Sequence, residues 1–257
     1  MKKYVLLFLV LALVAGANLL FVPIASAPVQ VVQYRVRAAF GDEIAQYRIG
    51  LIYAYGRGGL SRDDAKAVYF FRKAADKGYV DAQTELGYMY EGGRGVTLDK
   101  AQAVTWFRKA ATQGNARAQN ALGGAYDRGL GVPKDELQAL YWYRLSAAQG
   151  DVWGMNDLAW LYVTSTNPEV RNPTAALEYA LKAVKDTEYA PSPAILDTLA
   201  EAYYANEQYD DAVKTEQNAL DLLPVSLPAD KRAEYQERFD KYRRAKQKKK
   251  ESGGKEQ

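Results

Sequence analysis

The sequence of 257 residues contains no cysteine and no histidine. Without cysteine the chain forms no disulfide, offers no thiolate ligand for zinc and carries no cysteine-linked lipid anchor. Without histidine it lacks the commonest metal ligand and the base that Ser-His-Asp and Cys-His catalysis require. Carboxylates used in pairs, as in glycoside hydrolysis, are therefore the catalytic chemistry that remains open to it.

A long uncharged apolar run occupies residues 4–22, directly after two lysines. Small residues up to Ala27 follow, which is the pattern of a secretory signal peptide. Pro28 disfavours cleavage after Ala27, and the run is close to the roughly 18 residues that span a bilayer. We expect residues 1–27 to be a signal peptide or an uncleaved membrane anchor. Both alternatives predict export across the cytoplasmic membrane, with the protein periplasmic or anchored by this N-terminal helix.

The rest of the chain repeats itself. The stretch FFRKAADKGYVDAQTELGYMYEGGRG at 70–95 returns as WFRKAATQGNARAQNALGGAYDRGLG at 106–131, and in part at 142–162. Equivalent positions lie 36 residues apart, as in Gly78, Gly114 and Gly150. A period of this size indicates supersecondary units that cannot bury their apolar faces alone and therefore stack on one another.

Each unit is predicted to be a helix, a glycine turn and a second helix. Apolar residues have helical spacing in 81–90 and 99–111, and the glycine-rich EGGRG separates the two segments. Asp99 lies where a second helix begins, a position that favours an acidic cap. Gly87 and Gly123 stand inside first helices, where glycine costs about 1 kcal/mol relative to alanine. Their recurrence indicates that an aromatic side chain of the second helix packs against bare backbone.

These residues match a family. The pattern A-x-x-x-L-G-x-x-Y, followed by G-x-G-V, D, A and W-[FY]-R-K-A-A-x-x-G, resembles the Sel1-like repeat, a relative of the tetratricopeptide repeat. The match is close in residues 79–150 and good in 41–78. Residues 151–187 depart from it, because Ala159 replaces the glycine and the turn lacks glycine. Residues 193–223 resemble a tetratricopeptide repeat.

The resemblance implies an all-α fold, a right-handed α-solenoid of stacked antiparallel helix pairs. We expect the N-terminal hydrophobic helix to precede it. Tyr235, Phe239 and Tyr242 share one face of a charged segment, which predicts a capping helix that closes it. The expected parts are the signal peptide or anchor (1–27), a linker or half-repeat (28–40), three Sel1-like repeats (41–150), two tetratricopeptide-like repeats (151–228), a basic capping helix (229–250) and a disordered tail (251–257).

The acidic residues mostly have structural explanations. Asp99 and Asp135 recur as helix starts, and Asp63 occupies the matching place. Asp210 and Asp211 belong to the tetratricopeptide-like turn. The glycine turns lack the Gly-Lys-Ser/Thr and the preceding strand of a phosphate loop. We therefore predict a protein that is not an enzyme, with no catalytic residue, no metal site and no cofactor.

Residues that do not repeat are the candidates for binding. First-helix residues between the packing positions line the concave groove of tetratricopeptide arrays, and the equivalent residues here mix aromatic and polar side chains. Such a surface suits an extended peptide or a partner helix, although each residue is equally consistent with an ordinary solvated face. Trp160 is the first choice, because tryptophan is enriched in binding hot spots. The candidates are Tyr47, Leu51, Thr84, Tyr88, Glu91, Asn120, Asp127, Arg128, Asn156, Trp160, Asp197, Glu201 and Tyr204.

Positive charge gathers at the C-terminus. Residues 231–257 hold eleven Lys or Arg against five Asp or Glu, which is a net charge of +6. The net charge of the whole chain is only +3. Such a tail can contact an anionic membrane surface. The alternative is a solvated helix end followed by disorder. Export argues against nucleic acid as a partner.

Sel1-like proteins generally act as adaptors, in bacteria often at the cell envelope. The resemblance thus implies an exported, non-enzymatic protein–protein interaction scaffold that binds a peptide or partner protein in the concave groove. The alternative is a cell-envelope enzyme, or an enzyme accessory, that acts on cell-wall polymer through carboxylates. Two non-repeating acids converging in one cleft would favour the enzyme, and an apolar-rimmed groove without facing acids favours the scaffold.

Overall fold

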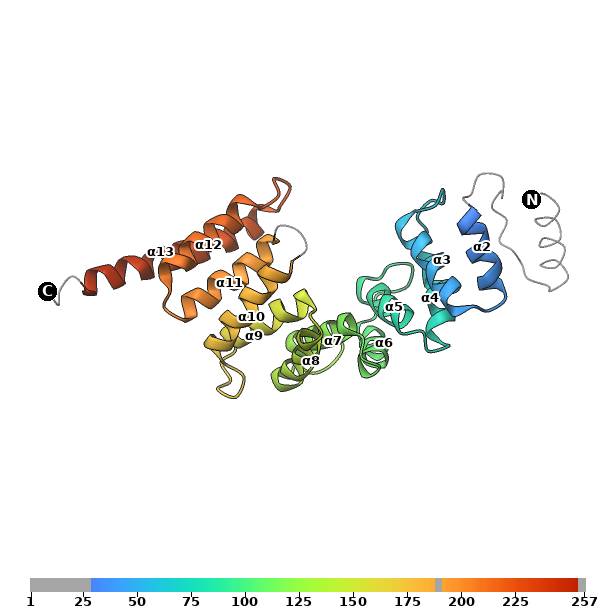
Figure 1. The fold of residues 1–257 in the computed structure, drawn as a ribbon, viewed down its shortest axis with the longest axis horizontal. Helices are drawn as coiled ribbons and strands as arrows, with labels where there is room; N and C mark the ends of the chain where they lie inside the picture. The colour runs from blue at the N-terminus through green and yellow to red at the C-terminus, as the bar shows by residue number, and fades with distance from the viewer. Residues whose placement is uncertain (1–28, 188–190, 254–257) are drawn as a thin grey trace. The chain divides into compact units, whose positions relative to one another are not determined.

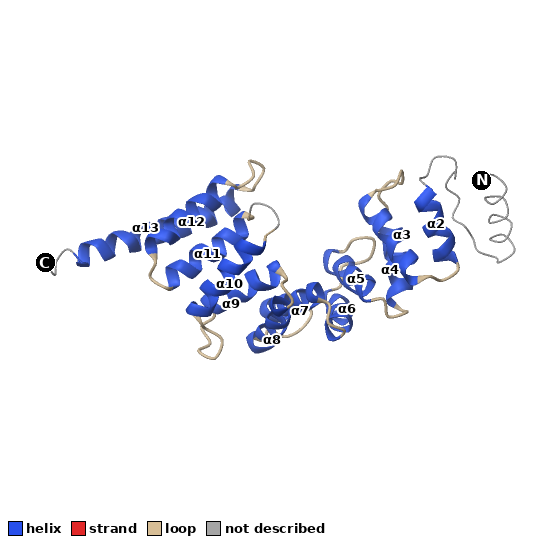
Figure 2. Cartoon of the chain, viewed as in Figure 1, coloured by secondary structure: helices blue, strands red, loops and turns tan. Residues whose placement is uncertain are grey.

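A computed structural model describes residues 29–187 and 191–253, which form twelve helices and no strand (Figures 1 and 2). The expected signal peptide or anchor lies outside these residues. No helix in the two described ranges combines the length and the apolar character needed to cross a membrane. The helices are α2 (Val29–Ala39), α3 (Glu43–Tyr55), α4 (Asp64–Ala75), α5 (Val80–Gly92), α6 (Lys100–Thr112), α7 (Ala116–Arg128), α8 (Glu136–Ala148), α9 (Val152–Thr164), α10 (Pro173–Asp186), α11 (Pro193–Ala205), α12 (Tyr209–Asp221) and α13 (Ala229–Gly253).

Helices that follow one another in sequence pack side by side. α3 packs on α4, α5 on α6, α9 on α10 and α11 on α12, so the structure confirms an all-α fold of adjacent helix pairs. The chain divides into two compact units that meet in sequence at Ala118 and Gln119, inside α7. Unit 1 contains α2 to α6 and unit 2 contains α8 to α13.

Recurring caps define the helix ends. Asp63, Asp99 and Asp135 each accept a hydrogen bond at 2.9–3.0 Å from the backbone N–H three residues later. These bonds satisfy donors that the first turn of a helix leaves free, so each aspartate begins a second helix as predicted. Gly56 and Gly93 end first helices with φ of +63° and +64°, a conformation that favours glycine.

In three successive repeats, the backbone of a glycine packs directly against an aromatic ring. A Cβ atom on Gly87 would lie 2.5 Å from the ring of Phe107, and one on Gly123 would lie 2.6 Å from the ring of Tyr143. Gly50 meets Phe71 in the same way, at 2.6 Å. The expectation that an aromatic of the second helix packs against these glycines is confirmed, and it explains why the helices carry glycine where alanine is more favourable.

Side chains replace glycine in the turn between α9 and α10. Arg171 donates to the carbonyl of Val163 at 2.6 Å, and the hydroxyl of Ser165 donates to Glu136 at 2.5 Å. Val170 is 1% exposed and fills the space beneath the turn. Asn172 then caps α10, which begins at a proline. The departure from the repeat pattern thus has its own local stabilisation.

The described chain begins and ends with single helices. α2 packs on α3 through Val31 and Ala38. α13 packs on α12, and Tyr242 is fully buried at 0% exposure while Tyr235 and Phe239 are partly buried. α13 continues to Gly253, past the expected end at residue 250 and into the expected tail, because the helical pattern persists through the lysines. Residues 254–257 of that tail lie outside the described range.

Candidate functional site

The first-helix candidates of unit 1 are half-buried aromatics. Tyr47 lies 5.1 Å from Tyr79 and 6.0 Å from Phe71, measured between ring centroids. Burial, followed by the nearby charge of Glu85, raises the pKa of Tyr47 to about 12. Leu51 packs against the same core. These two side chains therefore support the fold of unit 1 and leave only part of their surface open.

Thr84 requires a correction. It is 0% exposed, and its hydroxyl donates to the carbonyl of Val80 at 3.1 Å. Its direction on α5 places it inside the packing, so it does not line an open surface. Tyr88, one turn later, is partly exposed and packs edge-on to Phe107 at 5.0 Å, and Glu91 at the end of α5 is also partly exposed.

An ion pair joins two first helices in unit 1 and was not foreseen. Arg117 of α7 donates to Glu85 of α5 at 2.9 Å, and its guanidinium lies 5.3 Å from the ring centre of Tyr88. The repeat contained a signal for it, since Asp81, Arg117 and Trp153 occupy equivalent positions yet differ in charge and size. Positions whose residue type differs between repeats are the ones that give each repeat its own contacts.

The α9 helix of unit 2 presents two tryptophans. Trp160 is partly exposed, and Trp153, which the sequence analysis missed, is 49% exposed. Between them, Asp157 accepts hydrogen bonds from Asn120 at 3.1 Å and from Asn156 at 3.0 Å. Asn156 is only 6% exposed, so it supports this arrangement from beneath and does not line the surface as expected.

Arg128 and Asp127 lie at the end of α7. The Arg128 guanidinium reaches back over Gly124, where a Cβ would be 2.9 Å from Nη2 and 3.5 Å from the hydroxyl oxygen of Tyr143. Arg128 is exposed. Burial raises the pKa of the Asp127 carboxyl, although Lys134 and Arg128 act in the opposite direction. Both residues therefore stay candidates for contact with a partner.

The three candidates on α11 already have partners in α13. Asp197, 8% exposed, accepts from Arg238 at 2.5 Å. Glu201 accepts from Lys241 at 2.9 Å and from the hydroxyl of Tyr242 at 2.6 Å. Tyr204 lies 5.0 Å from the ring of Tyr242. In this structure the chain's own last helix covers the surface that these three candidates were expected to offer to a partner.

Two acids converge beneath α13. Glu216 is 0% exposed, its nearest cation is Arg238 at 3.8 Å, and its oxygens have no hydrogen-bond donor in the described part of the chain. Burial, and then the charge of Asp197, raises the pKa of Glu216 to about 8. Burial likewise raises the pKa of Asp197 to about 6, against the effect of Arg238. This is a carboxyl pair with shifted pKa values, but α13 encloses it.

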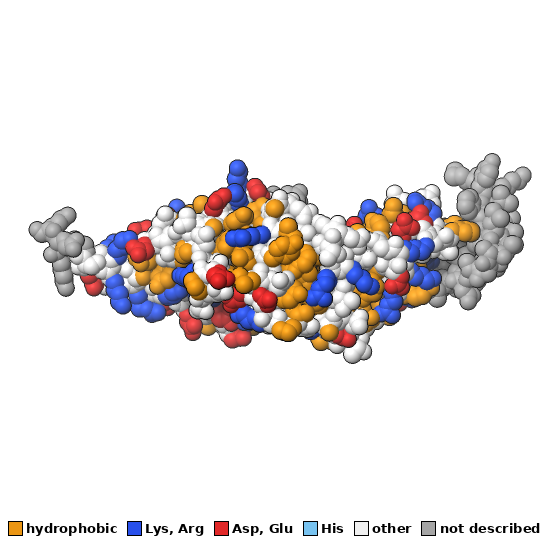
Figure 3. Space-filling view, turned by 90° about the horizontal axis from the view of Figure 1, so that it is seen from below, with side chains coloured by type: hydrophobic (Ala, Val, Ile, Leu, Met, Phe, Trp, Pro, Cys, Tyr) orange, Lys and Arg blue, Asp and Glu red, His pale blue; other side chains and the backbone are white. Residues whose placement is uncertain are grey.

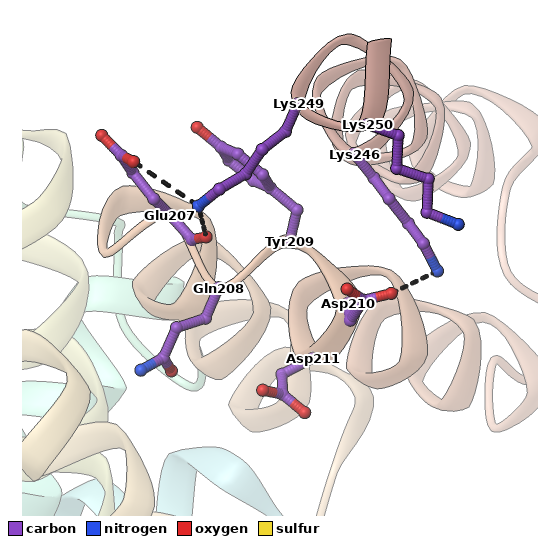
Figure 4. A pocket seen from close by; sticks show the side chains of 8 residues that line it. All are labelled: Glu207, Gln208, Tyr209, Asp210, Asp211, Lys246, Lys249 and Lys250. Carbon is purple, nitrogen blue, oxygen red and sulfur yellow. Dashed lines mark hydrogen bonds and ion pairs between the residues drawn. The ribbon is translucent and has the colours of Figure 1, made fainter. Parts of the chain in front are cut away.

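The basic end of α13 is partly neutralised. Lys246 pairs with Asp210 at 2.5 Å and Lys249 lies 3.7 Å from Glu207, where the two helices border a shallow hollow (Figure 4). Arg243 and Arg244 are exposed on the same helix, and Figure 3 shows basic side chains along it. Part of the positive charge expected to face an anionic surface is thus directed at α12. Residues 29–187 and 191–253 contain no cluster of three or more acids that could hold a metal ion.

Comparison with known proteins identifies the repeats. The family model described as "Sel1 repeat" matches residues 44–79, 80–115, 116–151 and 154–186. The fourth range lies in the segment that the sequence analysis assigned to a tetratricopeptide-like repeat. The ERAD-associated E3 ubiquitin-protein ligase component HRD3A of Arabidopsis thaliana is 41% identical over 66 residues, which are 26% of this chain and 9% of that protein.

Solved structures show the same fold. The protective antigen c5321 of uropathogenic Escherichia coli, described as displaying an SLR fold, is 30% identical over 81% of this chain and 48% of its own, with a TM-score of 0.61. A Sel1 repeat protein from Oxalobacter formigenes is 26% identical over 76% of this chain and 56% of its own, with a TM-score of 0.60. The chain therefore spans about half the length of these structures and a small part of the plant protein.

Proposed function

Since this chain belongs to the Sel1 repeat family, whose fold is a protein–protein interaction scaffold, we propose that it is an exported adaptor that binds a peptide or partner protein on the exposed faces of its first helices. The family is generally non-enzymatic. The finer points, namely export, the binding face and the nature of the partner, are the proposal.

The tryptophans of α9 carry this proposal. Trp153 is 49% exposed and Trp160 is partly exposed. Phe71 and Phe107, for comparison, are at most 1% exposed. Indole surface left open to water is unfavourable, and its burial against a partner contributes strongly to affinity. In unit 2 this face is the best-supported docking surface, because α13 covers the face of α11.

Residues 1–27 supply the argument for export. Two lysines followed by the apolar run at 4–22 are typical of a segment that directs a protein across the membrane. We propose a periplasmic or membrane-anchored location. The N-terminal mass of the mature protein distinguishes the two, because cleavage removes the apolar run and an anchor retains it.

Crosslinking in the native envelope tests the binding face. The protein is expressed at natural level, crosslinked in intact cells and purified under denaturing conditions, and the captured proteins are identified by mass spectrometry. Trp160→Ala should lose a specific partner that the parent protein captures. Tyr141→Ala is the matched control, because Tyr141 is 54% exposed on the second helix α8 and should retain the partner. If Trp160→Ala and the parent protein captured the same partners, the binding site would not be on α9.

The acids beneath α13 are the observation closest to the enzyme alternative. Asp197 and Glu216 do converge, but Glu216 is fully buried and α13 lies over both. A cell-wall polymer would have to displace the last helix to reach them. The scaffold is therefore the function that this geometry supports best.

A further inference from the structure

Ion pairs join a first helix to a later helix in two places. Glu85 of α5 pairs with Arg117 of α7 at 2.9 Å, and Asp197 of α11 pairs with Arg238 of α13 at 2.5 Å. The contact between α7 and α9 is different. There Asp157 accepts only from amide groups, and no lysine or arginine forms an ion pair with it in the described part of the chain.

The surroundings of Asp157 have too few hydrogen-bond donors. Asn120 and Asn156 each direct their amide N–H groups at the carboxylate. Their amide oxygens are buried and accept no hydrogen bond from any described residue. An amide has both donors and acceptors, whereas an ionised carboxylate only accepts, so this cluster has unused acceptors and lacks a donor. Burial raises the pKa of Asp157, although the hydrogen bonds from Asn156 and Asn120 and the charge of Arg128 act in the opposite direction.

The two tryptophans lie on the same side of α9 as this carboxylate. Trp153 precedes Asp157 by four residues and Trp160 follows it by three, and residues three or four apart are neighbours on a helix surface. Tryptophan is the aromatic side chain that attracts cations most strongly. Earlier repeats do not share this set, because Arg117 stands at the position of Trp153 and Gly124 at the position of Trp160.

The charge of Arg128 acts on Asp157 from a distance and lowers its pKa. Its guanidinium is held over Gly124 beside the hydroxyl of Tyr143, and it forms no ion pair with Asp157. Instead, Gly124 leaves α7 without a side chain where the equivalent Tyr88 of α5 covers Phe107.

We propose that Trp153, Asp157 and Trp160 form a subsite for a basic side chain, lysine or arginine, of an extended partner segment. The inference rests on the proposed scaffold function and specifies the chemistry of its partner. The charged end of the side chain donates to Asp157, and its methylene groups or guanidinium plane lie against the indoles. An acidic side chain would face a carboxylate, and an apolar one would leave that carboxylate without a direct ion-pair partner.

Titration of the full-length chain in mild detergent with short peptides tests the subsite. The probes are acetyl-Ala-Ala-Lys-Ala-Ala-amide, its arginine counterpart, and matched peptides with norleucine or glutamate at the central position. The readout is the set of four indole N–H resonances, assigned with single Trp→Phe variants. The lysine or arginine peptide should shift the Trp153 and Trp160 signals in a saturable way, with the signal of buried Trp106 unchanged.

The substitution Asp157→Asn should weaken the binding of the basic peptide at least tenfold. Glu178→Gln is the control, since it removes an exposed carboxylate from α10 with the same change in charge. Thermal unfolding of both variants verifies that the fold is kept. Equal binding of the glutamate or norleucine peptide, an undiminished affinity in Asp157→Asn, or no saturable shift with either basic peptide overturns the subsite.

The envelope crosslinking separates this inference from the function on which it rests. If Trp160→Ala loses the partner and Asp157→Asn retains it, the scaffold function is supported and the proposed binding of a basic side chain is contradicted. If both variants retain the partner, the proposal that α9 forms the binding face is contradicted. Loss in both variants, with retention in Glu178→Gln, supports the function and the subsite together.

Discussion

The ring of Phe107 lies directly on the backbone of Gly87, so closely that a Cβ atom there would be 2.5 Å from the ring. The contact joins the first and second helices of one repeat. It recurs between Gly50 and Phe71 and between Gly123 and Tyr143. Because no rotation of a methyl group relieves such an overlap, the aromatic ring or the helix axis must move if the glycine is replaced.

Gly87→Ala should therefore destabilise the protein by about 1–3 kcal/mol, the usual range for overpacking. Gly92→Ala is the control, because its Cβ would have ordinary contact with Arg94 at 3.6 Å and the change favours helix by up to ~1 kcal/mol. Urea denaturation measures both. Adding Phe107→Leu to Gly87→Ala should recover part of the loss. Equal effects of the two alanine substitutions would contradict the packing argument.

Glu216 should make stability fall as pH rises. Its pKa is about 8 in the folded protein against an ordinary 4.5, so between these values the folded state holds a proton that the unfolded state releases. The stability is fully present below about pH 4.5 and declines until about pH 8. Glu216→Gln should remove the part of this decline above pH 6 and be more stable than the parent at pH 8, by on the order of 2 kcal/mol. Urea denaturation between pH 6 and 8 measures it, because Asp197, with a pKa raised to about 6, contributes to the slope below that range. A slope that persists above pH 6 in the variant would place the titration elsewhere.

Tyr242 should hold α13 through its hydroxyl as well as its ring. Tyr242→Phe removes the 2.6 Å bond to Glu201 and should cost about 1.5–3 kcal/mol, as for hydrogen bonds to charged groups. Limited proteolysis should then cut within residues 229–253 sooner. Tyr235→Phe is the matched control on the same helix, since no hydrogen bond of its hydroxyl is found in the described residues. Similar proteolysis of the two variants would mean that the ring alone holds the helix.

Asp135 should contribute as a helix cap and nothing more. Asp135→Ala removes two hydrogen bonds of 3.0 Å to the start of α8 and should cost about 1 kcal/mol. Asp135→Asn keeps the accepting oxygen and should retain most of that stability. Thermal unfolding measures both changes. If the asparagine variant were as unstable as the alanine variant, the charge rather than the cap would be responsible.

The helix pairs could be predicted because their determinants are local and repeat. Asp99 and Asp135 stand at the same register as the helix starts they form, and Gly87 marked the aromatic contact before the structure showed it. The direction of individual side chains was harder to predict. Thr84 was placed between packing positions by counting, but it is fully buried. Trp153 was passed over, although Asp81 and Arg117 at its position showed that this position varies.

The contacts of Asp197, Glu201 and Tyr204 with α13 had no such signal. Their partners lie about 40 residues further along, in a helix that has no counterpart in the repeats. Periodicity compares a residue with its equivalents, so it cannot identify a contact that occurs once. The sequence indicated that α13 closes the array and gave no sign that it does so by occupying the very residues assigned to the partner.

Each glycine–aromatic contact lies within a single repeat of about 36 residues, and both residues come from the same helix pair. A gene that gains or loses one whole repeat leaves the glycine–aromatic contacts of the other repeats intact. The number of repeats can therefore change by whole repeats without separating any of these glycines from its ring.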